Sequence, residues 1–426
     1  MIRPTPLWRS VAVLGVAGLA LTACGGSSDT ASTSDKTPAA SSSGDTAKKG
    51  DGTLKIGTLL PQTGSLAFLG PPEFAGVDLA LKDINDAGGV NGKQVEKVDS
   101  DSGDTSTDTA SQSVDRLLSN NVDAIIGAAS SSVSLSVIDK VTSNGVLQIS
   151  PANTSDELTD YADKGLYFRT APPDVLQGRV LGDLILADGN TSVGILALQD
   201  SYGTGLASNA EKAITSGGGQ VVEKVVYDPK AASFAAEVGK IKAADPEAIA
   251  VIAFDETKKI IPEMVKQGIG PANKKIYFVD GNLANYDKDF PKGTLDGVKG
   301  TLPGVVADDS FKARLTALKP DLTEFAYSPE SYDATILIAL AAQAAGDDAG
   351  TSIASKMQEV SAGGTACTTF KDCVALLKDG KDIDYNGVSG PVEFNDKGDP
   401  SKATVGIYQY GADNKYTFVE GKDGEI

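Results

Sequence analysis

The 426-residue chain contains no histidine, which removes several common kinds of active site at once. Without an imidazole it has no Ser-His-Asp or Cys-His pair, no HExxH zinc helix and no histidine-based metal site. The sequence also lacks the GxSxG elbow, the GxxxxGK[ST] and GxGxxG glycine-rich loops and the SxxK pair. We therefore expect a protein that is not an enzyme and that carries no cofactor and no metal.

Positive charge is in deficit, with 38 Lys and Arg against 57 Asp and Glu and a formal net charge of −19. Neutralising nucleic-acid phosphates needs clustered basic side chains, so a nucleic-acid partner is not expected. The acidity favours solubility in an extracytoplasmic space and does not indicate the ligand.

Cysteine is scarce, with three residues, Cys24, Cys367 and Cys373. A secreted chain with one cysteine pair beyond its leader implies a disulfide. A metal site is disfavoured because no third thiolate lies near Cys367 and Cys373. We expect these two residues to form a structural bridge.

Long apolar runs are absent as well, and the stretch at residues 11–21 is too short to span a bilayer comfortably. Arg3 and Arg9 precede it, as in a signal peptide, and Leu21-Thr22-Ala23-Cys24 follows. That ending resembles a bacterial lipobox, in which the cysteine becomes the lipidated first residue; the alternative is an ordinary cleavage site. We predict a lipoprotein signal peptide at residues 1–23 and a lipid anchor on Cys24 at the outer face of the bacterial cell membrane.

Residues 24–52 carry no large apolar side chain and are predicted to form a flexible tether. From Thr53 onward, short apolar β-branched runs alternate with helical patterns. The clearest case is residues 122–154, where two buried strands flank a serine-rich turn and a helix. Such alternation predicts parallel sheets with right-handed crossovers, and the length suits two α/β domains.

Polar residues follow several of these predicted strands: Ser131 and Ser132, then Asn153 and Thr154, then Tyr202 and Asp280. In open α/β sheets ligands bind outside the carboxyl ends of the strands, and a helix N-terminus there suits a carboxylate. The serines could equally be plain helix caps, and a lone aspartate at a strand end is often a turn residue. Together, the residues favour a shared cleft.

Several short motifs occur in a fixed order along the chain. They are Glu73-Phe74-Ala-Gly76, Asp83-Ile84-Asn85, Gly88-Gly89, Gly127 with its serine run, Ile149-Ser150-Pro151-Ala152-Asn153-Thr154 and Asp200-Ser201-Tyr202-Gly203-x-Gly205. With this ordered set, the chain resembles the branched-chain amino-acid (Leu/Ile/Val) binding proteins, the type I periplasmic binding proteins that serve ABC importers, from about Leu54 to Tyr410. The segment at residues 367–390 also resembles members with a C-terminal disulfide.

The resemblance implies an α/β fold of two doubly wound parallel-sheet lobes joined by three hinge strands, a Venus-flytrap that closes over one amino acid. We expect lobe 1 at residues 53–172 and 302–403, and lobe 2 at residues 173–301 and 404–426. The hinges are expected near residues 171–173, 300–303 and 402–405.

By the same resemblance, Ser131 and Thr154 would hold the ligand carboxylate, with Asn153 beside them. The Ala152 carbonyl and the Asp280 carboxylate would take the ammonium. Residues expected to close over the ligand or face its side chain are Tyr202, Phe68, Leu69, Phe254 and Glu256.

This sequence departs from the family pattern at the ammonium partner, which is commonly Glu and here is Asp280. Leu69 replaces an aromatic residue, and Phe254-Asp255-Glu256 is acidic for a wall facing an aliphatic side chain. These departures leave a polar amino acid, an amide, urea or another small carboxylate open as ligand. The function expected is a monomeric, lipid-anchored receptor that delivers an amino-acid-like solute to ABC permease subunits; the alternative is a ligand sensor for a membrane signalling protein.

Overall fold

The computed structural model describes residues 49–426, which belong to one compact unit, Ala47–Ile426. The predicted signal peptide, Cys24 and most of the predicted tether lie outside the described residues. Among residues 49–426, no helix combines the length and the hydrophobicity that crossing a membrane would require.

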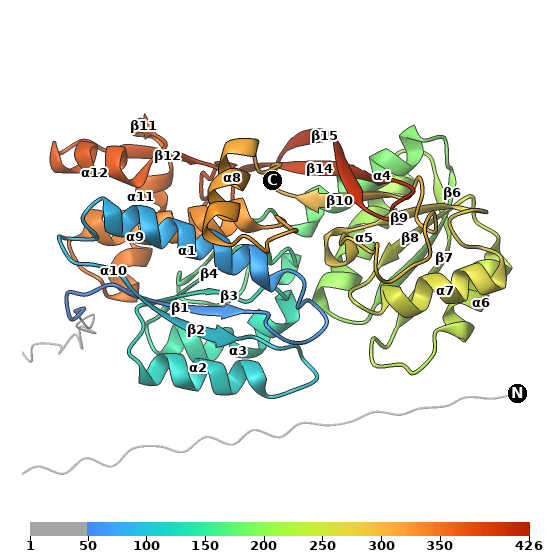
Figure 1. Cartoon of the computed structure of the whole chain (residues 1–426), viewed down its shortest axis with the longest axis horizontal. Coiled ribbons are helices and arrows are strands. Elements are labelled where there is room, and N and C mark those ends of the chain that lie inside the picture. The colour runs from blue at the N-terminus through green and yellow to red at the C-terminus, as the bar shows by residue number, and fades with distance from the viewer. Residues whose placement is uncertain (1–48) are drawn as a thin grey trace, which may run out of the picture. The chain divides into compact units, whose positions relative to one another are not determined.

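The first lobe is built on a five-stranded parallel sheet of order β2-β1-β3-β4-β5 (Figure 1). Its central strands β3 and β4 are buried at every residue, which explains why each is a continuous apolar run rather than an alternating one. The strands are β1 Lys55–Leu60, β2 Glu96–Asp101, β3 Ala124–Gly127, β4 Leu147–Ser150 and β5 Tyr167–Arg169.

Helices cover both faces of this sheet. On one face α1 (Gly70–Asp86) and α9 (Ser328–Ala345) share a core with alternate residues of β1, β3 and β4. On the other face α2 (Thr109–Ser119) and α3 (Ser131–Ser143) pack against Leu59 and Ile125. The sheet is therefore doubly wound, as the strand–helix alternation predicts.

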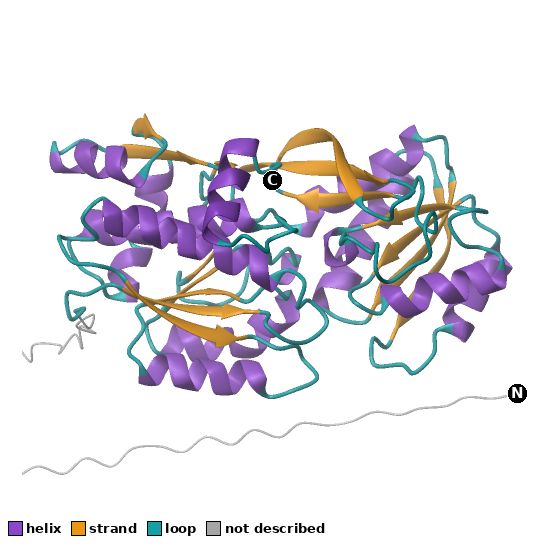
Figure 2. Ribbon diagram, viewed as in Figure 1, coloured by secondary structure: helices purple, strands orange, loops and turns teal. Residues whose placement is uncertain are grey.

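The second lobe contains a seven-stranded sheet of order β15-β14-β10-β9-β8-β6-β7. Figure 2 shows the strands in orange and the helices that accompany them in purple. It is parallel from β7 to β10, whereas β14 runs antiparallel to both β10 and β15. Its strands are β6 Ser192–Leu198, β7 Gln220–Tyr227, β8 Ala248–Ile252, β9 Lys275–Phe278, β10 Lys299–Pro303, β14 Lys402–Tyr410 and β15 Tyr416–Glu425. Its helices are α4 Asp174–Ala187, α5 Ser201–Ser216, α6 Ala235–Ala244 and α7 Thr257–Gln267.

After β10 the chain returns to the first lobe. Helix α9 is buried from Ser328 through Ala342 because it packs on α1, where the Cα of Gly76 lies close against the backbone of Ser328. The shorter elements that follow are α10 Gly350–Ala354, α11 Met357–Ser361 and α12 Phe370–Lys378, preceded by α8 Asp309–Leu318.

A small third sheet was not anticipated from the sequence, because its strands are very short. It consists of β11 (Thr365–Cys367), β12 (Ile383–Gly387) and β13 (Gly390–Pro391). The expected disulfide is present, and it joins Cys367 of β11 to Cys373 of α12 with a Cα–Cα distance of 5.4 Å.

The chain passes between the two large sheets at residues 170–173, 304–308 and 400–401. Two short 3-10 helices, η1 (Asp156–Leu158) and η2 (Asp280–Asn282), follow β4 and β9 at the carboxyl ends of their strands. These strand ends carry the residues predicted to form the binding site. The expected α/β class with two doubly wound lobes is confirmed.

Candidate functional site

A small cavity lies where the carboxyl ends of strands from the two lobes face each other. Its volume is about 10 Å³, close to the space that one water molecule needs. An amino acid can therefore enter only when the lobes move apart. Larger cavities of about 390, 310 and 570 Å³ lie elsewhere and contain none of the predicted ligand residues. The small cavity is lined by Leu66, Leu69, Ala129, Ser130, Ser131, Ala152, Tyr202, Phe254, Asp280, Gly281 and Tyr327.

The N-terminus of α3 supplies one wall. Ser130 is the N-cap residue, and its hydroxyl accepts the Val133 N–H at 3.4 Å. The Ser131 hydroxyl oxygen accepts the backbone N–H groups of Thr154 and Ser155, each at 3.2 Å. A hydroxyl has two lone pairs and one O–H, so Ser131 keeps its O–H as a donor. Together with the positive end of the helix, that donor makes this wall suitable for an anion.

The loop after β4 forms the adjoining wall and is held by hydrogen bonds to the loop after β3. Ser150 donates its hydroxyl to the Ala128 carbonyl at 2.7 Å and accepts the Asn153 N–H at 2.9 Å. The Asn153 amide donates to the carbonyls of Ala128 and Ala129 and accepts the Tyr167 hydroxyl at 3.0 Å. Asn153 therefore braces the loop and does not line the cavity.

Thr154 is buried beside the cavity but does not line it. Its N–H is bound to Ser131, and its carbonyl accepts the Asp174 N–H at 2.6 Å. Burial raises the pKa of the Asp174 carboxyl well above its ordinary value, and the neighbouring Thr154 hydroxyl partly offsets this. In this arrangement Thr154 shapes the site through its backbone.

Asp280 supplies the opposite wall from the second lobe. Its carboxylate accepts hydrogen bonds from Gln177 Nε2 at 2.8 Å, the Tyr202 hydroxyl at 2.6 Å and the Tyr327 hydroxyl at 2.7 Å. Burial raises the pKa of Asp280, and these hydrogen bonds act in the opposite direction. Asp280 is the one carboxylate in the described cavity wall, and no lysine or arginine of residues 49–426 lines the cavity.

Aromatic and aliphatic side chains complete the enclosure. Tyr202 stacks on Phe254 with ring centroids 5.5 Å apart and an interplanar angle of 11°. Leu66 and Leu69 come from the loop between β1 and α1. Tyr327 arrives from the start of α9 with a φ of +58°, a left-handed conformation that is unusual for a bulky residue.

The structure gathers most of the sequence-predicted residues around this cavity but not all of them. Leu69, Ser131, Ala152, Tyr202, Phe254 and Asp280 line it. Phe68 packs on the second lobe's core, and Glu256 accepts the Tyr227 hydroxyl at 2.8 Å instead of facing the cavity. Burial raises the pKa of Glu256.

Other residues contribute to the site although they were not among those predicted from the sequence. Leu66 and Ser130 lie in segments that the sequence had already placed near the site. Gln177 and Tyr327 carry no such signal, because each reaches Asp280 from an element remote from it in sequence. The full set that sequence reasoning missed is Leu66, Ala129, Ser130, Gln177, Gly281 and Tyr327.

Direct hydrogen bonds also join the two lobes outside the cavity wall. The Ser132 hydroxyl lies 3.2 Å from Asp200 Oδ2 and 2.9 Å from the Ser201 hydroxyl. The Asn209 amide donates to Asp156 at 2.6 Å. Burial raises the pKa of Asp200 to about 6. The structure thus shows the two lobes closed on each other.

Two α/β lobes, closed around a cavity with an anion-binding helix end on one side and a buried carboxylate on the other, define a two-lobed solute-binding protein. Residues 53–398 match the model of the family described as periplasmic binding protein. Because the match covers most of the chain, the chain belongs to that family, and the resemblance seen in the sequence is confirmed. Membership supports an extracytoplasmic location.

Individual relatives agree with this assignment. The chain is 28% identical over 378 residues to the Leu/Ile/Val-binding protein homolog 1 of Brucella abortus (strain 2308), covering 86% of this chain and 93% of that protein. The fold matches LivJ of Streptococcus pneumoniae, a branched-chain amino acid transporter substrate binding protein solved with isoleucine (TM-score 0.72, 22% identity, 88% of this chain and 100% of that one). It also matches a solute binding protein of an ABC transporter from R. palustris solved with benzoate (TM-score 0.70, 18% identity, 88% and 97%).

Proposed function

We propose that this protein is a receptor that binds one small amino acid with an apolar side chain between its lobes and delivers it to an ABC importer. The observation that carries the proposal is the pairing, across one cavity, of the buried Asp280 carboxylate with the N-terminus of α3. A zwitterion has one charge for each of these walls.

The ligand carboxylate would accept the Ser131 O–H at the positive end of α3. The ligand ammonium would donate to Asp280 and to the Ala152 carbonyl. Hydrogen bonds to charged groups contribute about 1.5–3 kcal/mol each. A few of them account for the roughly 8 kcal/mol that corresponds to micromolar affinity.

The remaining walls favour an apolar side chain. Leu66, Leu69 and the stacked Tyr202–Phe254 pair present carbon surface, and each methylene buried there contributes about 0.8 kcal/mol. An aromatic acid such as benzoate would fill the same space but would supply no cation for Asp280. Burying a carboxylate without a positive partner is unfavourable, so the site selects amino acids over simple carboxylates.

Binding would couple to lobe closure. The contacts of Ser132 with Asp200 and Ser201 form only when the lobes meet, and the crossovers at residues 170–173, 304–308 and 400–401 are the segments about which they can separate. A ligand that contacts both lobes stabilises the closed state by its differential affinity for that state.

Isothermal titration calorimetry of the full chain tests the ligand class. The panel is L-isoleucine, L-leucine, L-valine and L-alanine, the matching amines without a carboxylate, and benzoate with 4-hydroxybenzoate. We expect micromolar binding of at least one amino acid and much weaker binding of both the amines and the acids. Tighter binding of either benzoate than of every amino acid would contradict the proposal.

The importer role and the lipid anchor are part of the same proposal and rest on the Leu-Thr-Ala-Cys24 motif and on the family. Cys24→Ala is expected to release the protein from cells into the medium, as an immunoblot of cell and medium fractions would show. Uptake of labelled isoleucine should depend on this chain. Binding without any dependence of uptake would favour a ligand sensor instead.

A further inference from the structure

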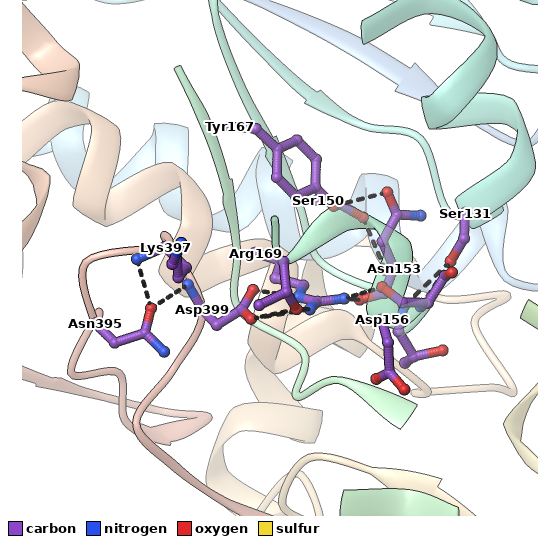
Figure 3. A network of polar contacts seen from close by, with 12 residues as sticks. Ser131, Ser150, Asn153, Asp156, Tyr167, Arg169, Asn395, Lys397 and Asp399 are labelled. Atoms are coloured by element: carbon purple, nitrogen blue, oxygen red, sulfur yellow. Dashed lines mark hydrogen bonds and ion pairs between the residues drawn. The ribbon is translucent and has the colours of Figure 1, made fainter. Parts of the chain in front are cut away.

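Arg169, the last residue of β5, is fully buried and forms an ion pair with Asp399 (Figure 3). Arg169 Nε donates to Asp399 Oδ1 at 2.6 Å, and Nη2 donates to Oδ2 at 3.0 Å. Both side chains are at most 1% exposed. The pair is therefore bidentate and shielded from solvent, which makes its geometry specific.

The remaining N–H groups of Arg169 are directed at the loop that follows β4. Nη1 donates to the carbonyls of Ser155 at 2.8 Å and Asn153 at 3.4 Å, and Nη2 also donates to the Thr159 hydroxyl at 2.7 Å. Thr159 in turn donates to Asp399 at 2.8 Å. A guanidinium has five N–H donors, and these contacts provide an acceptor for each. Buried N–H donors need acceptors, and two of the acceptors here are carbonyls of the loop that follows β4.

The contact with the Asn153 carbonyl has a geometric consequence in the cavity wall. In a planar trans peptide the C=O and the following N–H point in opposite directions. Because the Asn153 carbonyl faces Arg169, the Thr154 N–H must point away from it, and there it meets the Ser131 hydroxyl at 3.2 Å. That bond helps to leave the Ser131 O–H as a donor toward the cavity.

The pair also stands where two crossovers leave the first lobe. Residue 170, directly after Arg169, begins the first crossover, and Pro400, directly after Asp399, begins the third. The backbone of Arg169 donates to the Gly398 carbonyl at 3.0 Å, which joins the two segments. The Arg169 side chain therefore contacts the loop that follows β4, and the Arg169 backbone lies directly before a crossover.

We propose that Arg169, held by Asp399, is a positioning residue of the binding site: it orients the Asn153–Thr154 peptide so that Ser131 presents its O–H to the ligand, and it ties this loop to two of the crossovers. Arg169 touches no ligand in this scheme and acts through Ser131. The proposal deepens the proposed function and rests on it for the ligand, while the loop geometry can be tested without one.

The test compares the full-length chain with Arg169→Lys and Asp399→Asn. Lysine keeps the charge but cannot make the fork to Asp399 and the two carbonyls, and asparagine keeps the shape of its partner without the charge. The matched control is Arg314→Lys in the half-exposed pair with Asp83, remote from the cavity loop. Circular dichroism and thermal unfolding establish that each variant is folded, and Asp399→Asn carries the test if Arg169→Lys does not fold.

Amide hydrogen exchange of the ligand-free proteins is the decisive readout. We expect exchange at Thr154 and Ser155 to rise at least tenfold in both variants while the amides of β4 keep their protection. Unchanged exchange at Thr154 and Ser155, or an equal rise throughout β4, would overturn the positioning role.

Titration with L-isoleucine supplies the second readout, and we expect about tenfold weaker binding than in the Arg314→Lys control. Unchanged affinity together with faster loop exchange would overturn the link from the loop to the site. If the unsubstituted chain binds no amino acid, the proposed function fails, and the exchange data still decide whether Arg169 orients the loop.

Discussion

Replacing Asp280 by asparagine should weaken the binding of an amino acid without weakening the binding of a simple carboxylate. The substitution keeps the size of the side chain, and its amide oxygen can still accept from Tyr202 or Tyr327. It removes the one carboxylate of the described cavity wall. Gln177 then competes with Tyr202 and Tyr327 for the one side-chain oxygen that remains as an acceptor. The main effect is therefore electrostatic, with a smaller cost in stability.

The magnitude follows from the bond that is lost. A hydrogen bond between the ligand ammonium and an ionised carboxylate contributes about 1.5–3 kcal/mol, and each 1.4 kcal/mol corresponds to a factor of ten in the dissociation constant. Asp280→Asn should therefore weaken L-isoleucine binding by roughly 10- to 150-fold. Benzoate carries no cation, so removing a buried negative charge should leave its affinity unchanged or increase it.

Calorimetric titration of both ligands at pH 7 provides the measurement. The control is Asp296→Asn, which removes the same charge from an exposed position of the second lobe outside the cavity wall. Equal weakening of isoleucine and benzoate would mean that the variant damages the fold. Undiminished isoleucine binding would show that Asp280 does not hold the ammonium and would refute the assignment of this wall.

The remaining predictions concern a residue that the sequence did not reveal, pH and the disulfide. Tyr327→Phe removes one of the hydrogen-bond donors to Asp280 and should weaken isoleucine binding about fivefold. Tyr161→Phe on the first lobe is the control. An unchanged isoleucine affinity in Tyr327→Phe would argue against Tyr327 as part of the cavity wall. Burial raises the pKa of Asp123 to about 7, so its stabilising contribution is present below pH 4 and is lost as the pH rises through 7. Urea unfolding between pH 4.5 and 7.5 should accordingly show a flatter pH dependence for Asp123→Asn, and parallel curves would disprove this. Reducing the Cys367–Cys373 bridge should lower the free energy of unfolding by roughly 2 kcal/mol. It should leave ligand affinity unchanged, because neither cysteine lines the cavity. Loss of ligand binding on reduction would show that the bridge does support the binding site.

The alternation of strands and helices was largely predictable from the sequence. The two strands and the helix predicted within residues 122–154 are present as β3, α3 and β4, because periodicity and flanking turn residues are local signals. The antiparallel edge of the second sheet and the small third sheet were not foreseen in detail. Which strands become neighbours depends on packing between segments far apart in the chain.

The site was predictable at the level of strand ends and less so at the level of atoms. Ser131 and Asp280 stood out because polar residues after buried strands meet at one edge of a parallel sheet. Asn153 and Thr154 satisfy the same rule, yet neither lines the cavity: the Asn153 side chain is bound to Tyr167 and Ala128, and the Thr154 backbone N–H is bound to Ser131. A rule about positions cannot tell which hydrogen bonds are made inside the protein.

By itself, the sequence determined the α/β alternation, the disulfide and the strand ends that carry the polar residues, since each depends on nearby residues or on residue counts. Only the tertiary structure decided which atoms face the cavity. Tyr327 and Gln177 reach Asp280 from α9 and α4, and Arg169 turns the Thr154 N–H toward Ser131. These contacts join residues from distant parts of the chain, and buried polar groups must find such partners because leaving them unpaired costs free energy.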